Sequence, residues 1–181
     1  MKISVLMAEG FEEAEAVIVI DILRRAGFEV NLVSTTNEKK VTGGRKIKIF
    51  ADYIFEEYNF ENADILFIPG GGLGVENLLK SSKVENLIKK YFDQNKYIVA
   101  ICAAPLVLEK AGVLKGKKVT SYPSTEENLK SIAEYSSEKV VVDGKIITSR
   151  GFGTAMDLGL KLVEIFLGKQ ESDNIKKAVV Y

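Results

Sequence analysis

The residue best suited to covalent chemistry is the single cysteine. Cys102 directly follows the apolar run YIVAI and precedes AAPLVLEKAG, a segment with helical spacing. A thiol at such a strand-to-helix turn faces the free backbone N–H groups of the helix start, which favour the thiolate. We therefore expect Cys102 to be a nucleophile with a depressed pKa. The alternative is that Cys102 is a small buried hydrophobe.

The second candidate is Glu15, in a helix predicted over residues 12–26. The core-facing stripes of this helix are apolar apart from Glu15, whereas Glu13 is predicted to be solvated and Glu12 to lie at the boundary. Glu15 should point into the same crevice as Cys102, where burial would raise its pKa and keep it protonated. The alternative is that the three glutamates only complement the helix dipole.

The sequence of 181 residues contains no histidine. Imidazole is the commonest general base near neutral pH, so Ser-His-Asp, Cys-His and HExxH sites are excluded. A zinc site would have to use carboxylates beside one thiolate. The glycine run PGGGLG contains neither GxxxxGKS/T nor a full GxGxxG. We therefore expect neither a metal nor a cofactor.

Two further features could complete a site around the cysteine. The backbone N–H groups of PGGGLG could face a developing oxyanion beside Cys102. Tyr122 follows another predicted strand, and a phenol with an ordinary pKa of about 10 could donate a hydrogen bond but would be a poor base. The alternative for Tyr122 is an aromatic side chain at the rim of the crevice.

Length and charge limit the classes of protein that the chain can represent. A chain of this size suits one domain over residues 1–181, and 25 basic residues balance 25 acidic ones, which disfavours specific nucleic acid binding. The apolar stretch AVIVIDIL is too short to span a bilayer, so we expect no membrane association. One cysteine excludes an intramolecular disulfide and favours a reducing, cytoplasmic location.

Short aliphatic runs alternate with amphipathic stretches of helical length, which predicts an α/β fold with a mostly parallel sheet. The segment TGGRKIKIF alternates polar and apolar residues and is predicted to be a peripheral element. Strands are predicted at 3–7, 28–34, 64–72 (ending in a glycine loop), 97–102 and 118–121, a hairpin at Asp143-Gly144, and helices at 12–26, 83–94, after Cys102, at 124–133 and at 154–167.

Five segments, EGFEEAEAV, DILFIPGGGLGVENL, VAICAAP, KVTSYP and ITSRGFGTA, together resemble the ThiJ/PfpI superfamily. The resemblance is to its DJ-one-like branch, that of the parkinsonism-associated deglycase, and extends over nearly the whole chain. It implies a flavodoxin-like three-layer sandwich with helices on both faces of the sheet, and a homodimer. It also implies a nucleophile on a strained elbow at Cys102 and a protonated acid from the first helix at Glu15.

The same resemblance assigns the remaining residues of the site. Backbone amides of Gly70, Gly71 and Ala103 would form the oxyanion pocket. Arg25 and Arg45 match arginines that family members place near the pocket or the dimer interface. Tyr122 stands where many relatives carry histidine, which disfavours a protease or amidase and removes the metal site of the chaperone-like branch.

The resulting expectation is a cofactor-independent Cys/Glu enzyme of the glyoxalase III or deglycase type. Its substrates would be reactive dicarbonyls such as methylglyoxal, or their early adducts with proteins and nucleotides, so its partners would be a small carbonyl compound or a glycated protein. The main alternative is a redox-sensing stress protein with an oxidisable Cys102 and no turnover. A hydrolase is disfavoured, and a binding module stays open.

Overall fold

A seven-stranded sheet forms the centre of the computed structural model, which describes residues 1–181. The strand order is β10–β11–β7–β6–β1–β2–β5, and every neighbouring pair is parallel except β10–β11. The strands are β1 (Lys2–Met7), β2 (Glu29–Ser34), β5 (Tyr53–Ile54), β6 (Ile65–Ile68), β7 (Tyr97–Ile101), β10 (Val140–Asp143) and β11 (Ile146–Ser149).

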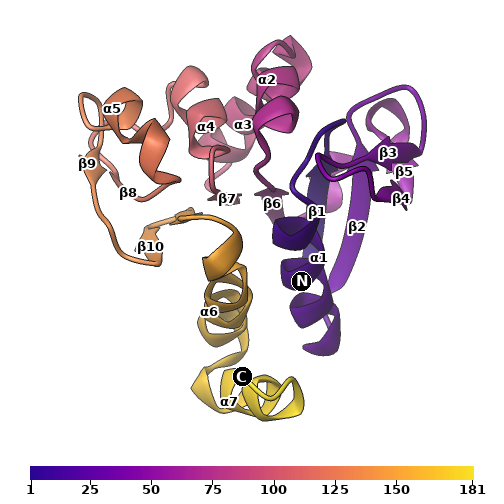
Figure 1. The fold of residues 1–181 in the computed structure, drawn as a ribbon, viewed down its shortest axis with the longest axis vertical. Helices are drawn as coiled ribbons and strands as arrows, with labels where there is room; N and C mark the ends of the chain where they lie inside the picture. The colour runs from indigo at the N-terminus through magenta and orange to yellow at the C-terminus, as the bar shows by residue number, and fades with distance from the viewer.

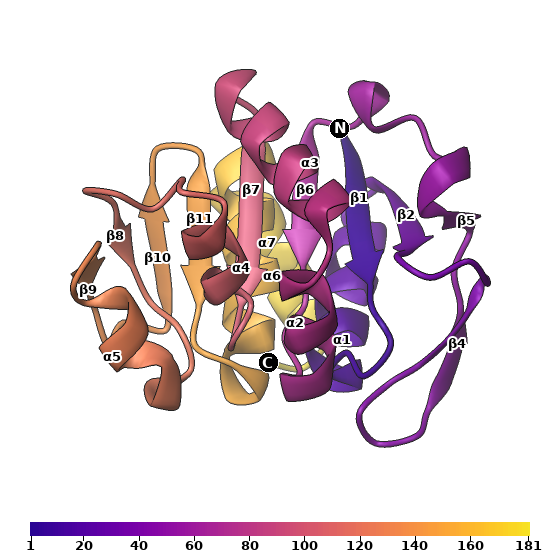
Figure 2. The same cartoon turned by 90° about the horizontal axis from the view of Figure 1, so that it is seen from above.

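Helices cover both faces of this sheet (Figures 1 and 2). One face carries α1 (Glu13–Arg25), α6 (Ala155–Leu167) and α7 (Lys169–Ala178), and the other carries α2 (Gly72–Leu79), α3 (Ser82–Asp93) and α4 (Pro105–Lys110). Two apolar clusters of 25 and 23 buried residues fill the two interfaces. Because the central strands are buried on both sides, they are continuous aliphatic runs. The predicted three-layer fold is confirmed.

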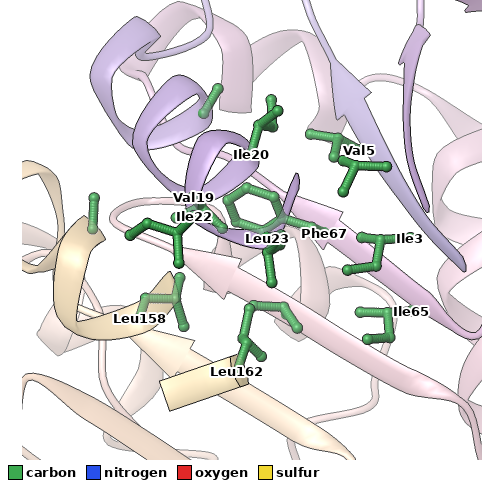
Figure 3. Packing of buried hydrophobic residues seen from close by; sticks show 14 of the residues in the cluster. Ile3, Val5, Val19, Ile20, Ile22, Leu23, Ile65, Phe67, Leu158 and Leu162 are labelled. Atoms are coloured by element: carbon green, nitrogen blue, oxygen red, sulfur yellow. The ribbon is translucent and has the colours of Figure 1, made fainter. Parts of the chain in front are cut away.

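The packing of α1 determines where its first turn lies. Ile22 and Leu23 of α1 pack with Leu158 and Leu162 of α6 over the sheet (Figure 3). At Gly159 a Cβ atom would lie 2.7 Å from Cδ1 of Ile22, so glycine permits the close approach of the two helices. The N-terminal end of α1 is thereby held over the carboxyl edge of the sheet.

The peripheral elements differ in part from the predictions. TGGRKIKIF forms an antiparallel hairpin, β3 (Lys40–Thr42) and β4 (Lys48–Phe50), outside the main sheet as predicted. The helix predicted over 124–133 is shorter: a 3-10 turn precedes α5 (Glu126–Leu129), and β8 (Lys118–Val119) pairs with β9 (Glu134–Tyr135).

Two helices, α2 and α7, have no counterpart in the sequence prediction. The first begins inside the glycine run, where local propensity gives no helical signal. The second buries only Ser172 and Ile175, so its apolar stripe is too narrow to show in the sequence. None of the helices combines the length and the apolar character that crossing a membrane requires.

Candidate active site

Four loops meet at the carboxyl edge of the sheet, and each contributes to one site. They follow β1, β6, β7 and β11, which are consecutive neighbours in the strand order. The loop after β1 leads into the first turn of α1, which carries Glu15, and Cys102 directly follows β7. Ligands of open α/β sheets bind at this edge, close to where the strand order changes direction.

Cys102 occupies a sharp backbone elbow. Its φ of 64° lies in the left-handed region, which a residue with a side chain seldom adopts. The N–H of Cys102 donates to the carbonyl oxygen of Ser149 at 2.9 Å, and the carbonyl oxygen of Cys102 accepts from the N–H of Tyr122 at 2.8 Å. These two bonds from flanking segments hold the strained conformation, which keeps the half-buried thiol aimed into the site.

Glu15 is the acidic partner of this thiol. Its side chain is 1% exposed, accepts a hydrogen bond from the N–H of Gly70 at 3.0 Å, and also bonds the Cys102 thiol and the backbone N–H of Phe152. Burial raises the pKa of Glu15 from 4.5 to about 7, against the lowering effect of these three hydrogen bonds. A carboxyl group with such a pKa can both accept and release a proton near neutral pH.

The thiol departs from the expectation of a depressed pKa. Burial raises the pKa of Cys102 to about 12, and the charge of Glu15 adds to the rise, whereas the backbone amides of Ala103 and Gly71 lower it. The contribution of Glu15 requires an ionised carboxylate. At low pH the thiol and the carboxyl group each carry a proton. After one of these protons is lost, Cys102 and Glu15 share the other, so the two groups titrate as a unit.

Two glycines make this contact possible. A Cβ atom at Gly70 would lie 2.5 Å from Cβ of Cys102 and 2.5 Å from Oε2 of Glu15. Gly71 has a φ of 101°, and a Cβ atom there would lie 2.6 Å from the backbone nitrogen of Glu12. Any larger residue at position 70 would separate the thiol from the carboxyl group.

The three amides predicted to hold an oxyanion have two different tasks. The N–H groups of Gly71 and Ala103 bond the sulfur of Cys102, so they face the position of an oxygen on an attacked carbon. The N–H of Gly70 donates to Glu15 instead. The Gly70 amide therefore orients the Glu15 carboxyl group, whereas the amides of Gly71 and Ala103 face the Cys102 thiol.

A cavity of about 550 Å³ opens beside the thiol. Tyr122 lies on its rim with 49% of its surface exposed, and Arg45 reaches it from the turn between β3 and β4. The lining residues are Glu12, Glu15, Arg45, Gly71, Gly72, Cys102, Ala103, Tyr122, Ser124 and Phe152.

Arg25 does not line the cavity beside Cys102, and Glu13 is not solvated as the sequence analysis predicts. Arg25 is at the far end of α1, about 15 Å from Glu15 at the rise of a helix, and it pairs with Asp21 at 2.5 Å. It lines a separate cavity between α1, α6 and α7. Glu13 was expected to be solvated but is 4% exposed, because the β3–β4 turn covers it and donates two backbone N–H bonds to its Oε1.

Sequence reasoning gave no role to Ser124 and Phe152. The Phe152 N–H bonds Glu15, and both side chains line the cavity. The signal for Phe152 was available, because GFGTA follows the strand that ends at Ser149 and strand ends of a parallel sheet share one edge. No three His, Cys, Asp or Glu side chains come together in an arrangement suited to a metal ion.

Residues 1–165 match the model of the DJ-1/PfpI family. This chain belongs to that family. The crystal structure of Drosophila melanogaster DJ-1beta superposes with a TM-score of 0.95 at 37% identity, covering 99% of this chain and 97% of that one.

Two curated relatives extend the comparison within the DJ-1/PfpI family. "Protein DJ-1 homolog B" of Arabidopsis thaliana is 39% identical over 99% of this chain, but the chain spans only 41% of its length. "Deglycase TK1284" of Thermococcus kodakarensis is 34% identical over 83% of this chain and 90% of its own. A relative with an enzymatic name is therefore matched over nearly its full length.

The shared proton predicts the pH dependence of Cys102 alkylation. Glu15 has a pKa of about 7 and loses its proton before the thiol does. The resulting carboxylate can take the thiol proton as sulfur attacks. We expect the rate of iodoacetamide alkylation to rise with a midpoint near pH 7, below the free-thiol value of about 8.5. In Glu15→Gln the thiol stays buried without its base, so the midpoint should move above the wild-type value.

Glu12→Gln is the matched control, since it changes carboxyl to amide at the same end of α1. Its midpoint should stay within a few tenths of a pH unit of wild type and fall slightly, because the charge of Glu12 raises the pKa of Glu15. A wild-type midpoint at or above the free-thiol value would contradict a base beside the sulfur.

Glu15 should also make stability depend on pH. Its pKa is higher in the folded protein, about 7, than the ordinary 4.5, so its contribution to stability is complete below pH 4.5 and is lost as the pH rises through 7. The free energy of unfolding of wild type should fall relative to Glu15→Gln by on the order of 3 kcal/mol between pH 5 and 8. Denaturant unfolding at several pH values measures it, and parallel curves for the two proteins would contradict a raised pKa.

Proposed function

We propose that this protein is a cofactor-independent enzyme that acts on reactive dicarbonyls such as methylglyoxal, or on their early adducts with amines and thiols. The observation that carries the proposal is the contact between the Cys102 thiol and the Glu15 carboxyl group, whose pKa is raised to about 7. The name of the Thermococcus deglycase supports the same class of chemistry.

The first step joins the thiol to the aldehyde carbon. Sγ of Cys102 attacks as its proton passes to Glu15, and the C–S bond forms while the carbonyl π bond becomes an alkoxide. The amides of Gly71 and Ala103, which bond the sulfur, are placed to donate to this oxygen. Glu15 then returns the proton, which gives a hemithioacetal.

The second step is an internal redox exchange. The Glu15 carboxylate removes the hydrogen of the former aldehyde carbon as a proton and delivers it to the neighbouring keto carbon. The hydroxyl proton of the hemithioacetal passes to the keto oxygen, so the keto group becomes an alcohol. One carbon is oxidised to a thioester as the next is reduced, so no external oxidant is required. Water then hydrolyses the thioester to a 2-hydroxy acid and frees the thiol.

The cavity admits more than a three-carbon substrate. Its volume of about 550 Å³ falls within the roughly 300–1,000 Å³ of sites that hold drug-sized ligands. Adducts of a dicarbonyl with an amino acid or thiol therefore suit the site as well as the free compound. A reducing cytoplasm suits an enzyme whose one cysteine must stay unoxidised.

Redox sensing is the competing function, and the same pair supports it. Two equivalents of a peroxide would convert the Cys102 thiol to a sulfinate, and protonated Glu15 would donate to a sulfinate oxygen. Such a protein is modified once per site and does not turn over. Time courses with limiting protein therefore separate the two functions.

We also propose that the chain forms a homodimer through the outer face of α1. Val17 is 46% exposed, and beside it lies a cavity of about 360 Å³ lined by eight residues, of which six are apolar. The face joins α1 to Met156 of α6 and Val179 at the end of α7. A second copy related by a two-fold axis would cover this apolar surface with its own.

Turnover is tested with purified protein and methylglyoxal in excess, with lactate as the measured product. Wild type should form many equivalents of lactate per chain, and Cys102→Ser should fall to background. Glu15→Gln should lose about a hundredfold or more, because an amide cannot carry the proton. A single equivalent of modified protein with no lactate would contradict the enzymatic function and favour redox sensing.

Sedimentation velocity at several concentrations tests the homodimer. Wild type should sediment as a dimer, and Val17→Glu should shift the population to monomer, because it places a charge in the apolar interface. Val142→Glu, at a residue 42% exposed on the edge strand β10, is the control and should stay dimeric. A monomeric wild type at all concentrations would overturn the proposal.

A further inference from the structure

The buried carboxylate of Glu13 takes no part in the chemistry proposed above. It lies in the first turn of α1, two residues before Glu15, and is 4% exposed. Its Oε1 accepts the backbone N–H of Arg45 at 2.7 Å and that of Ile47 at 3.3 Å, while its Oε2 is buried without a hydrogen-bond partner. Burial of an acid costs free energy, so such a group needs a structural or functional reason.

The partner of Glu13 is the turn between β3 and β4, residues 43–47. Within the turn, the N–H of Gly43 donates to the carbonyl oxygen of Ile47, and the N–H of Gly44 donates to that of Phe11 in the loop before α1. Gly43 packs directly on the carboxyl group, since a Cβ atom there would lie 2.2 Å from Cδ of Glu13. The turn is far from α1 in sequence, and Glu13 is the side-chain acceptor for two of its amides.

Arg45 lies at the tip of this turn and lines the cavity that contains Cys102. Arg24 and Arg25 each pair with an aspartate, whereas the exposed guanidinium of Arg45 has no ion-pair partner. It is also the one cationic side chain in the lining of that cavity. In Figure 2 the β3–β4 hairpin extends beside β2 toward the edge of the sheet where α1 begins.

We propose that Glu13 is a positioning residue that holds the 43–47 turn on α1 and thereby keeps Arg45 at the cavity, so that the site prefers reactive carbonyl compounds and adducts that carry a carboxylate. The preferred substrate class rests on the function proposed above, but the positioning of Arg45 does not. An unpaired guanidinium offers a planar fork that matches a carboxylate.

Alkylation of Cys102 with two reagents measures the charge preference without turnover. Sγ displaces iodide from either iodoacetate, which is an anion, or iodoacetamide, which is neutral. The ratio of the two rate constants cancels changes in thiol reactivity that affect both reagents equally. In Arg45→Gln the iodoacetate-to-iodoacetamide ratio should fall roughly three- to tenfold, as expected for loss of one charge near the reagent in a partly solvated cavity.

In Glu13→Ala, the direction in which the iodoacetate-to-iodoacetamide ratio changes distinguishes positioning of Arg45 from a direct effect of the Glu13 charge. Removing a negative charge should by itself raise the ratio, whereas loss of the turn's acceptor should release Arg45 and lower it toward the value of Arg45→Gln. Glu13→Gln keeps an acceptor oxygen for the two amides and should not lower the ratio. In the Arg45→Gln background, Glu13→Ala should cause no further decrease.

Gly43→Ala tests the same link with no change of charge and serves if Glu13→Ala does not fold. Its Cβ atom must push the turn away from Glu13, so the ratio should fall as it does in Arg45→Gln. Glu12→Gln, which removes a negative charge from the cavity lining itself, should raise the ratio. A ratio that rises or stays at the wild-type value in both Glu13→Ala and Gly43→Ala would overturn the proposal.

Substrate kinetics test the preference itself. The hemithioacetal of methylglyoxal with N-acetylcysteine is anionic, and the one with N-acetylcysteine amide is neutral. Gly43→Ala should raise KM for the anionic adduct several-fold, with little change in kcat or in KM for the neutral one. Equal KM changes for both adducts would overturn the substrate preference. Absence of turnover in wild type would contradict the proposed function but leave the alkylation test of Arg45 intact.

Discussion

Glu15 and Cys102 are in contact at a place where neither negative charge is well hydrated, and the arrangement of the site follows from this constraint. A buried carboxylate and a buried thiolate cannot both be ionised at low cost, so the pair retains a proton near neutral pH. When that proton is on the sulfur, the ionised Glu15 carboxylate is the base that can accept it, in a chain without histidine. The fold must therefore bring the first turn of α1 and the end of β7 together.

The parallel sheet meets this requirement through the order of its strands. Since β11, β7, β6 and β1 are neighbours, their four loops share one edge and supply the Glu15 carboxyl group, the Cys102 thiol and the backbone amides that contact them. Gly70 leaves the space in which the thiol meets the carboxyl group. The apolar interface of α1 with α6 fixes the helix, so the energy that holds Glu15 in place comes from packing distant from the reaction.

The site also depends on an element outside the main sheet. The β3–β4 hairpin adds nothing to the central strands, yet its turn covers Glu13 and delivers Arg45 to the cavity. Two acids of the same helical turn thus have separate surroundings: Glu15 faces the thiol, whereas Glu13 faces a loop. Their environments differ because residues two positions apart in a helix point to nearly opposite sides.

Much of the fold and the two central residues were predictable from local patterns. Aliphatic runs ending in glycine or cysteine identified the buried strands, and helical spacing identified Glu15 as the acid on the core side of α1. By contrast, α7 was missed because it buries too little apolar surface to leave a pattern. Sequence patterns were sufficient to predict the fold class and to place Cys102 and Glu15 at the same edge of the sheet, since strand ends and helix faces are properties of short segments. The bond from Gly70 to Glu15, the burial of Glu13 and the raised pKa of Cys102 follow from the tertiary structure alone, because desolvation and hydrogen-bond partners come from segments distant in the chain, such as Gly70 and Glu15, which are 55 residues apart.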